Sequence, residues 1–281
     1  MFDGADSSGE QTTLKGYPKG KGRDMPTTRR FEGKVAIVTG SSSGIGAEIA
    51  RRFAAEGASV VTNGRSQERA DVVAKEIEAT GGKAVGVEAD LRTWEGAEHL
   101  IDGASDAFGG VDFLVNNAGI SMIAPSDQLD PSEWERAIAT NLSGPYFSSR
   151  AAFPSMKARG GGTIVMIGSA AGHDGLPLRA AYCAAKHGLL GLTKTLAIDW
   201  APAGVRVMSV DPAYIKTPLD VADREAGGYD DESVERRTPL NRFGTVGEVA
   251  DAVLFCCSSQ ASYLTGSSLL VDGGWVAYGY L

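Results

Sequence analysis

The sequence predicts an α/β fold: a single doubly wound domain in which seven parallel strands carry helices on both faces. Two observations favour this class. From residue 34 onward, short β-branched runs alternate with segments of helical periodicity, and this alternation is typical of a parallel sheet covered on both sides. The region 31–281 also contains no repeat and no Pro/Ser-rich linker. We therefore expect one domain over 31–281, preceded by a flexible N-terminal extension over 1–30.

The extension over 1–30 is rich in glycine, serine, threonine and charge, with almost no apolar periodicity. No apolar run follows the charged residues at its end, so the segment differs from a signal peptide. Its composition is typical of a flexible chain. Met25 is an alternative start of the natural chain, and the sequence does not decide between the two starts.

Charge and composition exclude several classes of function. The chain has 281 residues, of which 43% are hydrophobic, and a formal net charge of −8. That length and content suffice for a sizeable core, while the negative charge argues against binding to nucleic acid or an anionic membrane. No stretch reaches the roughly 18 apolar residues of a membrane span. The three cysteines and three histidines lack metal-ligand spacing. We expect a cytoplasmic protein without a metal.

The expected strands are short runs in which β-branched residues predominate, and they lie at 34–39, 58–63, 83–89, 111–116, 162–168, 205–210 and 267–273. Two helix boundaries are marked clearly. Asp130 before Pro131 and Glu133 is typical of a capped helix start, and Gly57 is typical of a helix end. The stretch 218–241 is the least patterned part of the domain, and we interpret it as a loop that covers the substrate.

A glycine-rich turn follows the first expected strand. The segment TGSSSGIG at 39–46 places Gly40, Gly44 and Gly46 between that strand and a helix. Glycines permit a tight turn and a close approach of a ligand, and the helix N-terminus offers N–H groups to a pyrophosphate. The spacing differs from the commonest dinucleotide fingerprint, and glycine-rich turns are also purely structural. The flanking strand and helix favour dinucleotide binding.

The end of the second expected strand points to the type of dinucleotide. An NAD site commonly has an acidic residue there, which binds the adenosine ribose. This chain has Gly64 and Arg65 instead, followed by Ser66. An arginine pairs with the additional phosphate of NADP, and a serine adds a hydroxyl. We therefore expect NADP(H), with NAD(H) and a merely solvated Arg65 as the alternatives.

Several further motifs occur in a fixed order: Asp90-Leu91 after the third strand, NNAG at 116–119, Asn141, Ser169, Tyr182 with Lys186, and a final LVDGG. A tyrosine and a lysine at this spacing are, alone, more typical of helix packing. With the glycine-rich turn, and with Ser169 thirteen residues before Tyr182, the chain resembles the short-chain dehydrogenase/reductase family over residues 31–275. The resemblance implies a Rossmann-type fold.

The resemblance also implies catalytic roles. Tyr182 would be the general acid in carbonyl reduction and the general base in alcohol oxidation. Forming a tyrosinate at neutral pH costs roughly 4 kcal/mol, and Lys186, on the same helix face, would lower that cost and bind the nicotinamide ribose. Ser169 would donate a hydrogen bond to the substrate oxygen. Asn141 would help to hold a water in a proton relay to Lys186.

The cofactor contacts implied by the resemblance lie in the glycine-rich turn and after the third, fourth and sixth strands: Gly40, Ser42, Ser43, Gly44, Ile45, Gly46, Asp90, Leu91, Asn117, Ala118, Gly119, Ile215 and Thr217. Tyr182 and Lys186 complete this set. After the sixth strand the family pattern is close to NPGxIxT, whereas this chain has Asp211 for the asparagine and Ala213 for the glycine. Alanine has less backbone freedom than glycine, so the resemblance predicts the local path toward the nicotinamide less closely there than elsewhere.

The candidates for the substrate pocket follow Ser169, NNAG and the sixth strand: Ser121, Met122, His173, Leu176 and Tyr214. The leading hypothesis is an NADP(H)-dependent oxidoreductase that interconverts a secondary alcohol and a ketone. An NAD(H)-dependent sugar or polyol dehydrogenase is the alternative. A non-catalytic dinucleotide-sensing scaffold is disfavoured, because it need not keep both Tyr182 and Lys186. The family also implies a homotetramer or homodimer, and the aromatic tail at 275–281 is expected to pack on the core or on a partner subunit.

Overall fold

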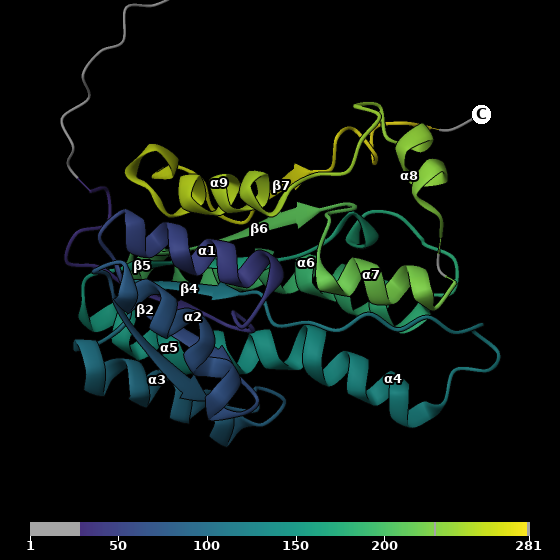
Figure 1. Cartoon of the computed structure of the whole chain (residues 1–281). Helices are drawn as coiled ribbons and strands as arrows, with labels where there is room; N and C mark the ends of the chain where they lie inside the picture. Colours follow the sequence, from purple (N-terminus) through teal and green to yellow (C-terminus); the bar gives the residue numbers. More distant parts are fainter. Residues whose placement is uncertain (1–28, 228, 280–281) are drawn as a thin grey trace, which may run out of the picture.

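The computed structural model describes residues 29–227 and 229–279 (Figure 1), so the predicted extension, apart from residues 29 and 30, lies outside the described residues. The strands are β1 (Val35–Val38), β2 (Ser59–Gly64), β3 (Lys83–Glu88), β4 (Phe113–Asn116), β5 (Gly162–Ile167), β6 (Val205–Pro212) and β7 (Ser268–Val271). They form one sheet in the order β3-β2-β1-β4-β5-β6-β7, and every neighbouring pair is parallel. The predicted fold class is confirmed.

The central strands are apolar because both faces of the sheet are covered. All four residues of β1 and of β4 are buried, as are five of the six in β5. Parallel strands of this kind form continuous hydrophobic runs instead of alternating patterns, and such runs marked the strands in the sequence. Each expected strand is present, and its boundaries differ by only a few residues.

Two layers of helices pack on the sheet. One layer consists of α1 (Gly44–Ala55), α2 (Gln67–Ala79) and α9 (Val246–Cys257), and the other of α3 (Trp94–Phe108), α5 (Gly144–Ala158) and α6 (Ala180–Trp200). Each layer has its own core. Phe31, Phe53 and Phe113 form an aromatic cluster in the first, and Leu114, Met156 and Leu189 lie in the second.

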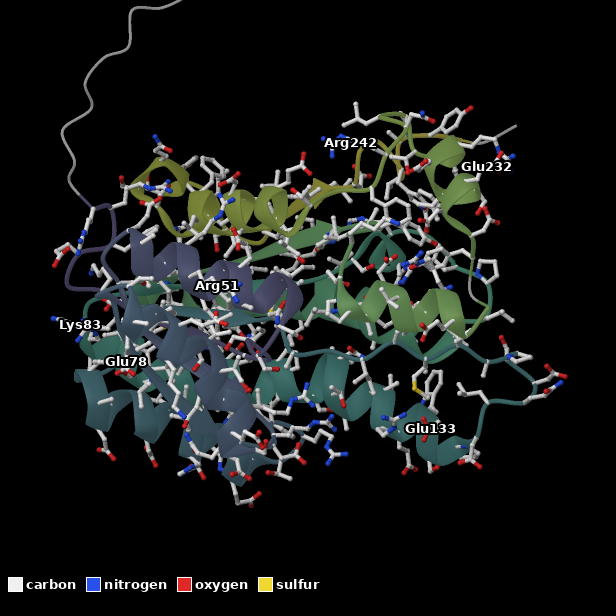
Figure 2. All side chains as sticks on the ribbon, in the orientation of Figure 1. Arg51, Glu78, Lys83, Glu133, Glu232 and Arg242 are labelled. Atoms are coloured by element: carbon white, nitrogen blue, oxygen red, sulfur yellow. The ribbon has the colours of Figure 1, made fainter. Side chains whose placement is uncertain are left out.

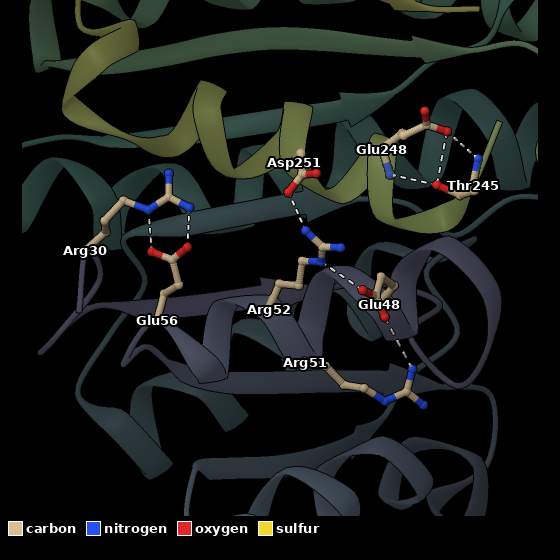
Figure 3. A network of polar contacts seen from close by, with 8 residues as sticks. All are labelled: Arg30, Glu48, Arg51, Arg52, Glu56, Thr245, Glu248 and Asp251. Atoms are coloured by element: carbon tan, nitrogen blue, oxygen red, sulfur yellow. Dashed lines mark hydrogen bonds and ion pairs between the residues drawn. The ribbon is translucent and has the colours of Figure 1, made fainter. Parts of the chain in front are cut away.

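Ion pairs connect α1 with its neighbours on the surface of the first layer (Figure 3). Arg52 of α1 donates from Nε to Glu48 Oε1 at 2.8 Å and pairs through Nη1 with Asp251 of α9. Thr245 and Glu248 form a capping box at the start of α9. Exposed pairs contribute about 0–1 kcal/mol each, so the apolar contacts beneath them account for most of the packing energy. Other charged side chains, such as Glu78 and Lys83, lie on the outside of the molecule (Figure 2).

The stretch 218–241, which we interpreted as a loop that covers the substrate, is not a loop throughout but contains two short helices, α7 (Pro218–Glu225) and α8 (Asp231–Arg237). The expectation was wrong because seven- and eight-residue helices carry too little apolar periodicity to be detected. The start of α8 is fixed locally, since the Asp230 side chain accepts a hydrogen bond from Ser233 N at 2.8 Å. Both helices lie beyond the carboxyl ends of β6 and β7 (Figure 1).

The other helix at this end of the sheet, α4 (Pro131–Ile138), begins where the sequence predicted, with Asp130 as its N-cap. Part of the aromatic tail packs on the same chain, because the Trp275 ring lies 4.7 Å from that of Tyr214 and is 5% exposed. Tyr280 and Leu281 lie outside the described residues. Within the described part of the chain, no helix is both long enough and apolar enough to cross a membrane.

Candidate active site

A cavity of about 370 Å³ opens at the carboxyl ends of the strands. The strand order reverses between β1 and β4, and in doubly wound sheets this is the position at which ligands bind. The cavity extends from the glycine-rich turn after β1, past the ends of β2 and β4, to the N-terminal part of α6 and to α7. It therefore reaches the motifs at both ends of the predicted site.

The turn after β1 forms the first wall of the cavity. Gly40 and Gly44 have positive φ angles of 59° and 57°, a conformation that favours glycine. Gly46 is required for a different reason, since a Cβ there would lie 2.4 Å from Asn117 Nδ2. Asn117 Nδ2 donates to the carbonyls of Thr39 at 2.9 Å and Gly40 at 3.1 Å. The side chain of Asn117 thus holds the turn against the end of β4.

The N-terminus of α1 fits a pyrophosphate. Among the described residues, Ser43 makes no side-chain cap and the first turn of α1 contains no acidic residue. The first N–H groups and the positive end of the helix dipole are therefore available to a negatively charged group. Ser42, Ser43 and Gly44 line the cavity at this point. The donor set and the elongated cavity together fit a dinucleotide.

Three arginines line the part of the cavity near the ends of β2 and β3. Arg65, Arg69 and Arg92 all line the cavity, together with Asp90. Arg92 Nε donates to Asp90 Oδ1 at 2.9 Å, and this hydrogen bond holds the pKa of Asp90 below its usual range. Ser66 is placed differently from the expectation, because its hydroxyl caps α2 by accepting from Arg69 N at 3.4 Å. Because Arg92 is paired with Asp90, the remaining positive charge at this end of the cavity comes from Arg65 and Arg69.

Ser169, Tyr182 and Lys186 lie on one wall of the cavity. Ser169 follows β5, and its Oγ accepts a hydrogen bond from Ala171 N at 3.1 Å. Lys186 Nζ donates to the carbonyl of Ile167 at 2.6 Å and lies 5.6 Å from the centroid of the Tyr182 ring. The end of β5 and the face of α6 thus bring these three side chains together.

Desolvation shifts both titratable groups of this wall toward their neutral forms. It raises the pKa of Tyr182, opposed by a hydrogen bond with Ser169. It lowers the pKa of Lys186 to about 8, opposed by the nearby carboxylate of Asp211. A neutral phenol beside an ammonium with a pKa near physiological pH is suited to proton transfer.

Asn141 is fully buried in a π-helical turn at Ala139–Ser143. Its Oδ1 accepts from Ile120 N at 3.0 Å, and its Nδ2 donates to the carbonyls of Ile120 and Ala137, both at 3.0 Å. The side-chain amide thus connects the segment after β4 to the end of α4. π-helical turns frequently occur at functional sites, and this one lines the cavity.

Asp211, at the position where we noted a departure from the family pattern, is fully buried. Its Oδ2 lies 2.6 Å from His173 Nε2, and its Oδ1 accepts a hydrogen bond from Ser209. The carboxylate therefore lies beneath the segment that carries Ser169. A buried carboxylate without such partners would be costly.

The structure brings most of the predicted residues to the cavity. The predicted cofactor residues that line it are Gly40, Ser42, Ser43, Gly44, Ile45, Arg65, Asp90, Leu91, Asn117, Ala118, Gly119, Ile215 and Thr217. Gly46 and Ser66 are not among the residues that line it. Of the substrate candidates, Ser121, Leu176 and Tyr214 line the cavity, whereas His173 contacts Asp211 and Met122 Sδ contacts Arg136.

The prediction missed several residues that line the cavity: Arg69, Arg92, Arg136, Arg179, Asp220, Asp223, Tyr229 and Trp275. Arg179 was detectable, because it precedes Tyr182 by three residues on the predicted helix face. Asp220, Asp223 and Tyr229 were not, because they belong to the stretch that we interpreted as a loop.

A family model described as short chain dehydrogenase matches residues 34–227. The protein 3beta-hydroxysteroid dehydrogenase 1 of Eggerthella lenta is 42% identical over 255 residues, which cover 88% of this chain and 95% of that protein. D-beta-hydroxybutyrate dehydrogenase of Rhizobium meliloti is 38% identical over 255 residues, which cover 87% of this chain and 99% of that protein.

Among solved structures, the chain is similar to a gluconate 5-dehydrogenase from Burkholderia cenocepacia, crystallised in complex with NADP and tartrate. The TM-score is 0.84 at 33% sequence identity, and the match covers 90% of this chain and 98% of the other. This chain is therefore similar to dehydrogenases of one family in both its sequence and its structure.

Replacing His173 by alanine is expected to lower the free energy of unfolding by about 2 kcal/mol, because the buried Asp211 carboxylate loses a hydrogen-bond partner. His187→Ala is the matched control, since that histidine is exposed and its Nδ1 lies 2.9 Å from a carbonyl of its own helix, and we expect a change within about 0.5 kcal/mol. Urea unfolding of both variants measures the difference. Equal losses would show that the contact between His173 and Asp211 adds no stability.

Proposed function

The chain belongs to the short-chain dehydrogenase family and is an NAD(P)-dependent dehydrogenase that acts on alcohols, and from this premise we propose that it interconverts a secondary alcohol and a ketone with NADP(H). Tyr182 is the general acid and base of the proposed reaction. The observation that carries the proposal is the placement of Tyr182, Lys186 and Ser169 on one wall of a cavity that fits a dinucleotide. The names of the relatives, which are dehydrogenases of a hydroxysteroid and a hydroxy acid, support an alcohol as substrate.

In ketone reduction, the bound nicotinamide cofactor supplies a hydride to the carbonyl carbon. The Tyr182 hydroxyl donates its proton to the carbonyl oxygen, and the raised pKa of Tyr182 keeps that proton in place at neutral pH. The Ser169 hydroxyl donates a hydrogen bond to the same oxygen and stabilises its developing negative charge. In alcohol oxidation the same groups act in reverse.

Lys186 supports the proton transfer. Its ammonium group lies beside the Tyr182 ring and stabilises the tyrosinate that remains after proton donation. With a pKa of about 8, Lys186 exchanges protons readily near neutral pH. Asn141 fixes the segment after β4, which borders the same wall, and we propose that it helps to place a water through which Lys186 is reprotonated.

The arginines at the end of β2 support NADP(H) as the cofactor. Arg65 and Arg69 line the cavity, and no acidic residue stands at the position where NAD-specific sites carry one. Two guanidinium groups would bind the additional phosphate through charge-assisted hydrogen bonds. The NADP in the solved gluconate 5-dehydrogenase is consistent with this choice.

Tyr182→Phe is expected to lower kcat for ketone reduction by about 1000-fold, because the proton donor is lost while the ring is kept. Its Kd for NADPH should stay within about twofold of that of the wild type. Steady-state rates and fluorescence titration measure the two quantities. Tyr263→Phe, at a fully exposed tyrosine, is the control and should behave as wild type. A Tyr182→Phe enzyme with the rate of the wild type would disprove the proposed mechanism.

Ketone reduction is expected to slow as the pH rises through about 8, because Lys186 has a pKa of about 8 and its protonated fraction falls over that range. Alcohol oxidation requires a base and should become faster over the same range. The measurement is kcat/KM in both directions between about pH 6 and pH 10. Asp211→Asn removes the carboxylate that raises the pKa of Lys186, so the inflection should move to lower pH. An inflection at the same pH in both proteins would contradict this assignment.

Arg65→Ala and Arg69→Ala are each expected to raise the Kd for NADPH by about 10-fold and to change the Kd for NADH by less than about twofold, because only NADPH carries the additional phosphate. Arg51→Ala is the matched control, since Arg51 pairs with Glu76 at the surface and does not line the cavity. Calorimetric titration with both cofactors provides the constants. Tighter binding of NADH by the wild type would favour the NAD(H)-dependent alternative.

A further inference from the structure

We propose that the substrate carries a carboxylate group and that Arg179 binds it. This inference rests on the proposed function, because it names the class of alcohol or ketone that enters the same cavity. Three observations carry it: the position of Arg179, its incomplete pairing, and the origin of its partner Asp223.

Arg179 is the residue before α6, three positions ahead of Tyr182. Residues at that spacing on a helix are neighbours, and Arg179 lines the cavity beside Tyr182. Burial raises the pKa of Tyr182, and of the charges near its hydroxyl Asp223 raises that pKa and Arg179 lowers it. The guanidinium group of Arg179 therefore lies at the end of the cavity where the reacting oxygen of the substrate would be bound. Arg65 and Arg69 lie at the other end.

Arg179 is only 5% exposed, yet its hydrogen bonds are long and few. Nη2 lies 3.2 Å from Asp223 Oδ2, and Nη1 lies 3.4 Å from the Pro177 carbonyl. A guanidinium group has five donors, and its ion pairs with carboxylates are commonly bidentate with distances of about 2.7–2.9 Å. The contact with Asp223 is long and involves one donor, so the fork of Arg179 can still bind a carboxylate more closely.

The partner of Arg179 comes from a different part of the chain. Asp223 belongs to α7, and its Oδ2 also accepts a hydrogen bond from Ser121 Oγ at 2.9 Å. The same helix exposes Leu219 and Val221 to solvent. We infer that Asp223 neutralises Arg179 until a substrate arrives. The substrate carboxylate then takes its place on the guanidinium group, while Asp223 keeps its hydrogen bond to Ser121.

The polar groups near Arg179 differ in how they are satisfied. The indole Nε1 of Trp275 is buried without a hydrogen-bond partner among the described residues, but it has almost no accessible surface. The hydroxyl of Tyr229 is already engaged, since it donates to Asp220 Oδ1 at 2.7 Å. The donor that this end of the cavity offers to a carboxylate is therefore the incompletely paired guanidinium group of Arg179.

An uncharged substrate is the competing explanation. It would leave Arg179 and Asp223 as a permanent ion pair in a wall that also contains Leu176, Tyr214, Trp275 and the carboxylate of Asp220. Buried ion pairs are often no more stabilising than apolar residues of similar size. Stability alone therefore gives little reason for a charged group at this position, whereas recognition of a carboxylate requires one.

The test compares substrates that differ only in charge. Acetoacetate and acetoacetamide form one pair, and 4-oxocyclohexanecarboxylate and 4-oxocyclohexanecarboxamide form a second pair of larger size. Each is reduced by the purified full-length enzyme with NADPH and with NADH, and the ratio of kcat/KM for acid over amide is determined. Because both members of a pair meet the same folded fraction, the ratio is insensitive to partial unfolding of a variant.

The wild type is expected to prefer the acid by at least about 10-fold in one of the pairs. Arg179→Met should lower that ratio by about 10- to 100-fold, and Arg179→Lys, which keeps the charge but not the fork, should lower it less. Asp223→Asn should raise it, because the competing carboxylate is removed. Arg224→Met is the matched control on α7, where Arg224 pairs with Asp220 and Asp231, and it should leave the ratio within about twofold.

Three outcomes would overturn the inference: amides reduced as well as or better than acids by the wild type, a ratio unchanged by Arg179→Met, or a ratio lowered by Asp223→Asn. Each of these leaves the proposed function intact, because a ketone is still reduced. Reduction of neutral ketones alone, with no acid reduced, would likewise overturn the inference. Failure to reduce the four ketones and also every member of a wider set of neutral ketones, with either cofactor, would instead contradict the proposed function.

Discussion

The whole site depends on how closely the turn after β1 is held against the ends of its neighbouring strands. Asn63 of β2 accepts a hydrogen bond from Gly40 N and donates to the carbonyls of Val87 in β3 and of Ala89 just after it. Asn117 donates to the same turn from the β4 side. These two side-chain amides fix the place where the sheet order reverses, and Gly46 is needed because a side chain there would displace Asn117.

Hydrogen bonds from a side chain to backbone groups of another element also position the wall of the cavity that carries the proposed catalytic residues. Lys186 is fixed by the carbonyl of Ile167 at the end of β5, and Asn141 by the backbone of Ile120 after β4. Because such bonds have defined directions, they place side chains from α6 and the π-helical turn more precisely than apolar packing alone would. The sheet supplies the fixed ends against which the helices are oriented.

Local patterns explain what the sequence could predict. The central strands are continuous β-branched runs, and the motif residues stand at strand ends, so their meeting at one edge follows from the parallel topology. The helices α7 and α8 were missed because they are short and polar. The pairs His173–Asp211 and Arg179–Asp223 join residues 38 and 44 positions apart. Neither pair has a local signature, and each depends on segments whose path was not predictable.

These two pairs also illustrate a common constraint on the cavity. Asp211 and Arg179 are both charged and almost fully buried, and a buried charge is tolerated only with a partner. Asp211 has partners from the sheet and from the segment after Ser169, elements that are held firmly. The partner of Arg179 comes from α7, which lies outside the two helical layers of the sheet. The carboxylate of Asp211, compensated by these partners, raises the pKa of the Lys186 ammonium. In the proposed recognition, Arg179 exchanges the carboxylate of Asp223, which comes from α7, for that of the substrate.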